Sequence, residues 1–172
     1  MLSERMQKEL NKQINAEFYS AYLYFSMSAY FQDKGLTGFA KWMEAQTVEE
    51  IGHAKKIYDY VFDRGGKVEL EEIKKPPKEW NSPLDAFKSA LEHERYVSGL
   101  INNLVKIAME ENDYMTNNFL QWFVAEQVEE EASVSEIVQK LEMIGDRGNG
   151  LFMMDRELGQ RTITLPLNQN SK

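Results

Sequence analysis

Four glutamates and one histidine are the residues of this sequence whose types and spacing could bind metal ions. Four long segments carry apolar residues at spacings of seven, and one glutamate interrupts each apolar line near the middle of its segment. These glutamates are Glu17, Glu50, Glu94 and Glu130. His53 follows Glu50 by three residues, so both side chains face the same side of a helix. Carboxylates with one imidazole suit iron or manganese, and suit zinc less well.

The charge of these glutamates needs compensation if the segments pack as antiparallel helices. Antiparallel packing brings the segment midpoints to one depth, so four carboxylates would meet in the centre of a bundle. An unpaired buried charge costs several kcal/mol. The matching positions hold no Lys or Arg. The sequence therefore predicts that bound protons or a multivalent cation neutralise this cluster.

The two halves of the sequence repeat this arrangement imperfectly. Glu17 and Glu50 are 33 residues apart, and so are Glu94 and Gln127. Helical bundles that bind two metals use one Glu from each of two helices and a Glu-x-x-His pair from each of the others. The two candidate pairs here are Glu50-Ile51-Gly52-His53, which fits, and Gln127-Val128-Glu129-Glu130, which is a variant. Although one Glu-x-x-His motif is weak evidence, four seam glutamates related by a repeat favour a shared metal site.

A centre for two iron ions follows from these positions. The predicted ligand sets are Glu17, Glu50 and His53 for one ion, and Glu50, Glu94 and Glu130 for the other. Glu50 is the candidate bridge between ions about 3.5–4 Å apart, while Gln127 would only form a hydrogen bond. Two Fe(II) ions at this spacing can each give one electron to one O₂. The ion without an imidazole should bind less tightly.

Five neighbouring residues allow more than one interpretation. Tyr24 could be an ordinary core residue or could hydrogen-bond a ligand carboxylate. His93 lies about 100° off the apolar line of its segment, which indicates a surface or contact histidine. The acidic residues Glu49, Glu126 and Glu129 could form a solvated face or an outer cation site beside the centre.

Glycine and proline residues divide the chain into five predicted helices. The long helices are expected at 4–33, 36–64, 83–112 and 115–144, and a short one at 151–159. Short turns join the first pair and the last pair, so each pair should form an antiparallel hairpin. The middle connection, residues 65–81, could extend about 56 Å, which exceeds the expected helix length of about 42 Å. The predicted fold class is all-α, a four-helix bundle with a long crossover between helices 2 and 3 and a short fifth C-terminal helix.

The bulk composition limits the remaining possibilities. A chain of 172 residues suits one domain, expected over residues 1–160, with a flexible polar tail over 161–172. The absence of cysteine excludes disulfides and thiolate metal ligands. A net charge of −8 argues against nucleic acid as a partner; it fits the attraction of cations, and equally an ordinary acidic protein. Because no signal segment or long apolar run is present, we expect a cytoplasmic protein without a membrane partner.

The short fifth segment also bears on assembly. Its apolar residues form one stripe, made of Leu151, Phe152, Met154 and Leu158. The predicted bundle has no free apolar face left to cover this stripe. An uncovered stripe usually marks an interface, so the chain is expected to form a homo-oligomer.

This combination of residues resembles the non-haem ferritins of bacteria and archaea along residues 1–160. The features that carry the resemblance are Glu17, Tyr24, Glu49-Glu50-x-x-His53, Glu94 and Glu126-Gln127-Val128-Glu129-Glu130, with the long crossover and the short fifth helix. The resemblance implies a ferroxidase that stores iron: shells of about 24 subunits oxidise Fe(II) with O₂ at a diiron centre within each subunit and hold Fe(III) mineral inside. The implied ligands are Glu17, Glu50, His53, Glu94 and Glu130, with Gln127 nearby. A third iron position is implied near Glu49, Glu126, Glu129 and Glu130.

Departures from related families narrow the assignment. Bacterioferritins carry a second Glu-x-x-His where this chain has Gln127-x-x-Glu130, and a haem-ligating Met where it has Ile51, so haem is not expected. Rubrerythrins need cysteine ligands. Animal-type ferritins line a pore with carboxylates where this chain has Asn117 and Leu120, which leaves the iron entry route open. One alternative from another class also stays open, a structural helical bundle whose buried acids bind no redox metal.

Overall fold

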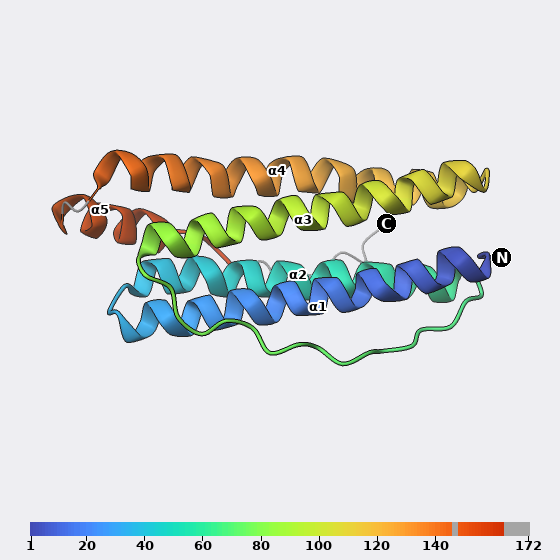
Figure 1. Cartoon of the computed structure of the whole chain (residues 1–172), viewed down its shortest axis with the longest axis horizontal. Coiled ribbons are helices and arrows are strands. Elements are labelled where there is room, and N and C mark those ends of the chain that lie inside the picture. The colour runs from blue at the N-terminus through green and yellow to red at the C-terminus, as the bar shows by residue number, and fades with distance from the viewer. Residues whose placement is uncertain (146–147, 164–172) are drawn as a thin grey trace.

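The computed structural model describes residues 1–145 and 148–163 of the chain, which form five helices. These are α1 (Glu4–Asp33), α2 (Thr37–Asp63), α3 (Pro83–Glu110), α4 (Tyr114–Ile144) and α5 (Gly148–Leu158). Helices α1 and α2 form one antiparallel hairpin, α3 and α4 form the other, and α5 lies at one end of the bundle (Figure 1). The predicted all-α four-helix bundle is confirmed. None of the helices in these two stretches is long and apolar enough to cross a membrane.

Local sequence signals set the ends of the long helices. At the start of α3, Ser82 Oγ accepts a hydrogen bond from Asp85 N at 3.1 Å, and Pro83 fills the first helical position, where no N–H is needed. After α1, Gly35 has a φ of 72°, a left-handed conformation that glycine adopts without a steric penalty. The resulting turn is short enough to return α2 directly against α1.

The fifth helix begins at Gly148 and not at residue 151 as the sequence predicts. Glycine is a helix breaker in solution, so Gly148 and Gly150 favour a loop when only local propensity is considered. Packing overrides that preference, because α5 turns back closely against the end of α4. A Cβ atom on Gly150 would lie 2.7 Å from Cγ2 of Ile144. The small residue is therefore needed for contact between the helices.

The predicted uncovered stripe on the fifth helix is wrong in part. Met154 and Leu158 are 4% and 6% exposed and pack into the apolar core of the same chain, with Leu151 against them. The large exposed side chains of α5 are instead Phe152 and Met153, which are 70% and 71% exposed. The stripe is thus divided between the core and the surface.

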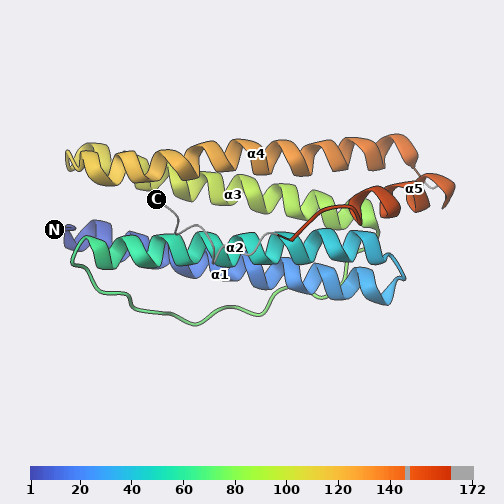
Figure 2. The same cartoon turned by 180° about the vertical axis from the view of Figure 1, so that it is seen from behind.

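The crossover between α2 and α3 runs along the outside of the bundle for most of its length (Figures 1 and 2). Polar side chains of α1 hold its backbone: Asn11 Nδ2 donates to Lys67 O at 3.0 Å, and Asn15 Nδ2 donates to Glu72 O at 3.1 Å. These bonds satisfy carbonyl groups that have no helical partner. The predicted long crossover is confirmed, and it lets α2 and α3 run in the same direction.

Two apolar clusters fill the bundle on either side of a polar layer. One cluster, at the α5 end, includes Phe31, Phe39 and Phe87, and the other includes Leu10 and Ile57. Close packing on both sides excludes bulk water from the layer and fixes its depth in the bundle. The candidate metal centre occupies this layer.

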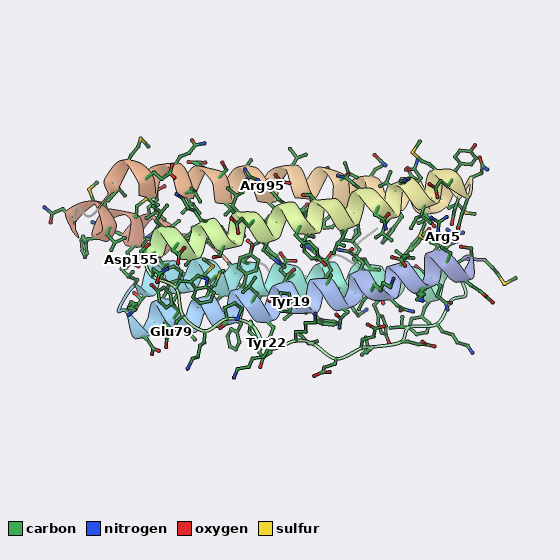
Figure 3. The ribbon with its side chains drawn as sticks, in the orientation of Figure 1. Arg5, Tyr19, Tyr22, Glu79, Arg95 and Asp155 are labelled. Carbon is green, nitrogen blue, oxygen red and sulfur yellow. The ribbon has the colours of Figure 1, made fainter. Side chains whose placement is uncertain are left out.

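Helix α5 is fixed to the start of α2. Asp155 Oδ1 accepts hydrogen bonds from Gly38 N at 2.8 Å and from Phe39 N at 3.0 Å, so this carboxylate caps the N-terminus of α2. Figure 3 shows Asp155 at the end of the bundle. A Cβ atom on Gly38 would lie 1.6 Å from Asp155 O, so only glycine permits this approach. This anchor sets the path of the residues that follow α5.

Candidate metal centre

The residues that the sequence singles out as ligands meet at the middle of the bundle. Each of the four long helices contributes one buried glutamate. The exposed fractions are 1% for Glu17, 2% for Glu50, 1% for Glu94 and 5% for Glu130. His53 lies one turn after the α2 glutamate and is 5% exposed. In Figure 3, the labelled residues Tyr19 of α1 and Arg95 of α3 lie near the middle of the bundle and close in sequence to Glu17 and Glu94. The apolar residues at heptad spacing around each glutamate turn it inward.

The half of the centre on α1 and α2 has free ligand atoms. Ligand atoms of Glu17, Glu50 and His53 all lie within 4.8 Å of one another. His53 Nδ1 is 3.3 Å from Glu50 Oε2 and 3.9 Å from Glu17 Oε2. Gln13 Nε2 donates to Glu17 Oε1 at 2.8 Å, but Glu17 Oε2 is buried and has no hydrogen-bond partner. A buried carboxylate oxygen without a donor, beside an imidazole, fits a metal ion.

In the half of the centre on α3 and α4, the carboxylates of both glutamates accept hydrogen bonds. The Tyr24 hydroxyl donates to Glu94 Oε1, and Gln127 Nε2 donates to Glu94 Oε2 at 3.3 Å. Gln46 Nε2 donates to Glu130 Oε2 at 2.6 Å. All of these donors are neutral. They orient the carboxylates of this half without balancing their charge.

Burial raises the pKa of all four glutamates. The pKa of Glu17 and that of Glu50 lie well above the usual range, because of burial first and of nearby carboxylates second. Burial also raises the pKa of Glu94, and burial together with the charge of Glu94 raises the pKa of Glu130 to about 7. In the described part of the chain, no Lys or Arg forms an ion pair with any of these carboxylates. Protons or a multivalent cation must balance them.

The three outer acidic residues occupy different environments. Glu126 is half-buried and brings a carboxylate oxygen within 4.8 Å of ligand atoms of His53 and Glu130. Burial raises its pKa, and the negative charges of Glu129 and Glu49 raise it further. Glu129 is exposed, whereas Glu49 is half-buried and forms an ion pair with Arg161. The sequence does not predict this ion pair, and it shows that Arg161, the first residue of the expected flexible tail, contacts the bundle. The rest of that tail from residue 164 lies outside the described residues.

Two buried glutamines at the centre receive no role from the sequence alone. Gln13 precedes Glu17 by four residues, and Gln46 precedes Glu50 by four, so each lies on the same helix face as a candidate ligand. Gln46 is fully buried, and its Oε1 has no hydrogen-bond partner. The Gln-x-x-x-Glu spacing, repeated in both helices of the first hairpin, was the signal available for finding them.

His93 lies outside the centre. Its Nε2 is 2.7 Å from Ser20 Oγ, and its ring packs against Tyr19 with centroids 5.7 Å apart. Burial lowers its pKa to about 4, so the imidazole is neutral at physiological pH. The sequence indicates a surface or contact histidine, and His93 is a contact residue between α1 and α3.

The fold and the candidate centre together are those of a four-helix bundle with a carboxylate-rich site in its core. Within this class, the sequence matches the ferritin family, as a ferritin-like domain, over residues 7–144. The chain therefore belongs to the ferritin family. The family match spans all four long helices except the first few residues of α1.

Individual relatives agree with this assignment. A bacterial non-heme ferritin of Bacteroides fragilis is 48% identical over 161 residues, which cover 94% of this chain and all of that protein. One of Campylobacter jejuni is 44% identical over 156 residues, covering 91% and 93%. A solved structure of an open pore ferritin from the hyperthermophilic archaeon Archaeoglobus fulgidus superposes with a TM-score of 0.94 at 53% identity, covering 94% of this chain and all of that one. The predicted resemblance is confirmed, and the chain functions in iron storage with ferroxidase activity.

Proposed function

We propose that each subunit oxidises Fe(II) with O₂ at a two-iron centre in the polar layer of the bundle. The single observation that carries this proposal is the set of four buried glutamates and one histidine without a Lys or Arg counter-charge in the described residues. Iron is the substrate, and two Fe(II) ions supply one electron each to O₂. The chain's contribution is to bind the pair and to keep the ions close together.

Each ligand has a distinct part in this proposal. Glu17 and His53 hold the first ion, and the free Glu17 Oε2 supplies a ligand atom without breaking a hydrogen bond. Glu50 bridges the ions in this proposal, because its carboxylate lies beside Glu17 and His53 and is also within reach of the charges of Glu94 and Glu130.

The second ion binds a different set of residues. Glu94 and Glu130 are its ligands. Tyr24 and Gln127 position Glu94 through the hydrogen bonds described above. This ion lacks an imidazole of its own and displaces neutral donors, so it binds less tightly than the first ion.

Oxidised iron leaves the centre along an outer acidic path in this proposal. Glu126 lies beside His53 and Glu130, and the negative charges of Glu49 and Glu129 raise its pKa. A third iron ion would bind transiently among these carboxylates.

The proposal also includes assembly and location. We propose that about 24 copies of the chain form a closed, symmetric shell in the cytoplasm. The support from this chain is the exposed apolar surface at the α5 end, where Met143, Phe152 and Met153 are 77%, 70% and 71% exposed. Large exposed apolar side chains that lie together usually mark an interface. Light scattering that gives only a 20.0 kDa particle would contradict the shell.

Addition of Fe(II) to the purified protein under air tests the proposed function. We expect ferric absorbance to grow well above the rate in buffer, oxygen to be consumed, and iron to stay soluble inside the protein particle. A structural bundle that binds no redox metal would leave the rate of oxidation at the buffer value and the iron would precipitate.

A further inference from the structure

Arg161 lies where a cation would bind at the outer end of the acidic path. Its Nη2 is 2.5 Å from Glu49 Oε2, and its guanidinium carbon is 4.4 Å from the ring centroid of Trp42. Nη1 also donates to Trp42 O at 3.4 Å. The side chains of Arg161 and Glu49 are 22% and 34% exposed, so the pair is partly shielded from water. In the described residues, Glu49 is the outer acidic residue that has a basic partner of this kind.

The path of the chain after α5 explains how Arg161 reaches Glu49. Asp155 fixes α5 to the start of α2, and Lys41 Nζ donates to Gly159 O at 2.9 Å. The chain therefore leaves α5 beside α2. Trp42 and Glu49 are seven residues apart on α2 and so lie on one helix face. The Trp42 ring holds the guanidinium group, and Glu49 pairs with its charge.

The surroundings of Glu49 make this pairing relevant to iron. Glu49 adjoins Glu50 in sequence, and its negative charge reaches both Glu126 and Glu130. A cation at Glu49 would be stabilised by these carboxylates. The guanidinium group of Arg161 supplies one positive charge at this position and fills it sterically. A metal ion and Arg161 therefore exclude each other at Glu49 Oε2.

We propose that Arg161 is a gating residue, which closes the outer cation site at Glu49 until an incoming iron ion displaces it. This inference rests on the outer acidic path of the proposed function. Displacement requires only the Arg161 side chain to swing away from Trp42 and Glu49, so this guanidinium group controls how fast oxidised iron leaves the centre. Arg161 acts through Glu49 and does not touch the reacting ions.

Equilibrium titration of the metal-free assembled protein with Tb(III) tests the gate, because Tb(III) prefers oxygen ligands and its emission is sensitised by nearby indole rings such as Trp42. The emission lost in Glu49→Gln is assigned to the outer site. We expect Arg161→Gln to bind Tb(III) at this site about twofold to fivefold more tightly, as removal of a partly exposed competing ion pair allows. Arg161→Lys keeps the charge and should stay near the natural affinity.

Lys41→Gln is the matched control, because Lys41 holds the same segment through Gly159 without touching Glu49. We expect its Tb(III) affinity to equal that of the natural protein. An equal gain in Lys41→Gln and Arg161→Gln would show that anchoring of the segment matters and that the charge does not, and would overturn the gate. A melting temperature for each variant confirms that folding is retained.

The two levels of the inference fail in different ways. Unchanged affinity in Arg161→Gln, with loss of binding in Glu49→Gln, would overturn the gate and leave the outer path intact. Unchanged binding in both variants would overturn the outer path itself. After one anaerobic filling and a pulse of air, Arg161→Gln should also clear oxidised iron from the centre several-fold faster, measured as recovery of fast Fe(II) oxidation.

Discussion

The two halves of the metal centre differ in how their ligands are satisfied without metal. On the α1–α2 side, Glu17 keeps a buried oxygen with no donor, and His53 faces two carboxylates. On the α3–α4 side, Tyr24 and Gln127 donate to Glu94, and Gln46 donates to Glu130. The first half thus keeps one buried oxygen without a donor, whereas both carboxylates of the second half accept hydrogen bonds.

From this difference we propose that similar buried carboxylates bind metal unequally. A cation entering the first half pairs an orphan oxygen and relieves a desolvation penalty. A cation entering the second half must replace existing hydrogen bonds, so its net gain is smaller. The broken sequence repeat, in which Glu130 stands where the first half has His53, acts in the same direction.

Removal of a first-half ligand should have the largest effect. We expect Glu17→Ala, Glu50→Ala or His53→Ala to slow the fast phase of Fe(II) oxidation on the order of tenfold to a hundredfold, because the first ion loses a ligand. Stopped-flow absorbance measures the initial rate. Glu92→Ala, which changes an exposed glutamate of α3, is the control and should keep the natural rate. Unchanged rates in all three ligand variants would refute the assignment of the centre.

A second prediction concerns restored symmetry between the halves. The double variant Gln127→Glu with Glu130→His gives the second half the same Glu-x-x-His pair as the first. We expect it to bind the second ion about tenfold more tightly and to form mineral more slowly, because oxidised iron stays in the centre. Mineral formation followed by ferric absorbance measures this. Faster mineral formation in the double variant would show that weak binding in the second half does not drive release.

The pH dependence of stability gives a third prediction. The folded-state pKa of Glu130 is raised from 4.5 to about 7, so its protonated form stabilises the fold. That contribution is complete below pH 4.5 and is lost as the pH rises through 7. The metal-free protein should therefore lose about 1–3 kcal/mol of stability between pH 5 and pH 8 from this residue.

Thermal unfolding at both pH values measures the effect, and two comparisons sharpen it. Glu130→Gln, which cannot ionise, should show a smaller loss between pH 5 and pH 8. Addition of Zn(II) at pH 8 should recover stability in the natural protein, because the cation replaces the lost protons. A natural protein that is more stable at pH 8 than at pH 5 without metal would contradict the raised pKa.

The smallest expected effect concerns the two buried glutamines, Gln46 and Gln13, whose substitution should affect metal binding differently. Gln46→Leu removes the donor to Glu130 and should tighten binding of the second ion about threefold. Gln13→Leu is the matched variant on the other side and should leave the first ion's affinity nearly unchanged, since Glu17 Oε2 is free in either case. Anaerobic Co(II) titration by absorbance gives both affinities. Weaker second-ion binding in Gln46→Leu would mean that the amide positions Glu130 for metal and does not compete with it.

The sequence predicts the positions of the long helices, because periodic apolar residues and Gly or Pro signals are local features. The burial of the four glutamates follows from the same periodicity. The start of α5 differs from the prediction because Gly148 and Gly150 disfavour a helix locally, whereas the close approach of α5 to Ile144 leaves no room for a Cβ atom at position 150. The Arg161–Glu49 pair joins residues 112 apart in sequence, and no local pattern specifies it. Likewise, heptad spacing places Gln46 in the seam but cannot show which carboxylate accepts its hydrogen bond.

Stepwise anaerobic Fe(II) loading, followed by crystallography at each ratio, tests the unequal centre most directly. We expect density to appear first among Glu17, Glu50 and His53, and to appear among Glu50, Glu94 and Glu130 only after more iron is added. Equal occupancy of both positions at every ratio, or earlier filling of the second position, would contradict the difference between the two halves.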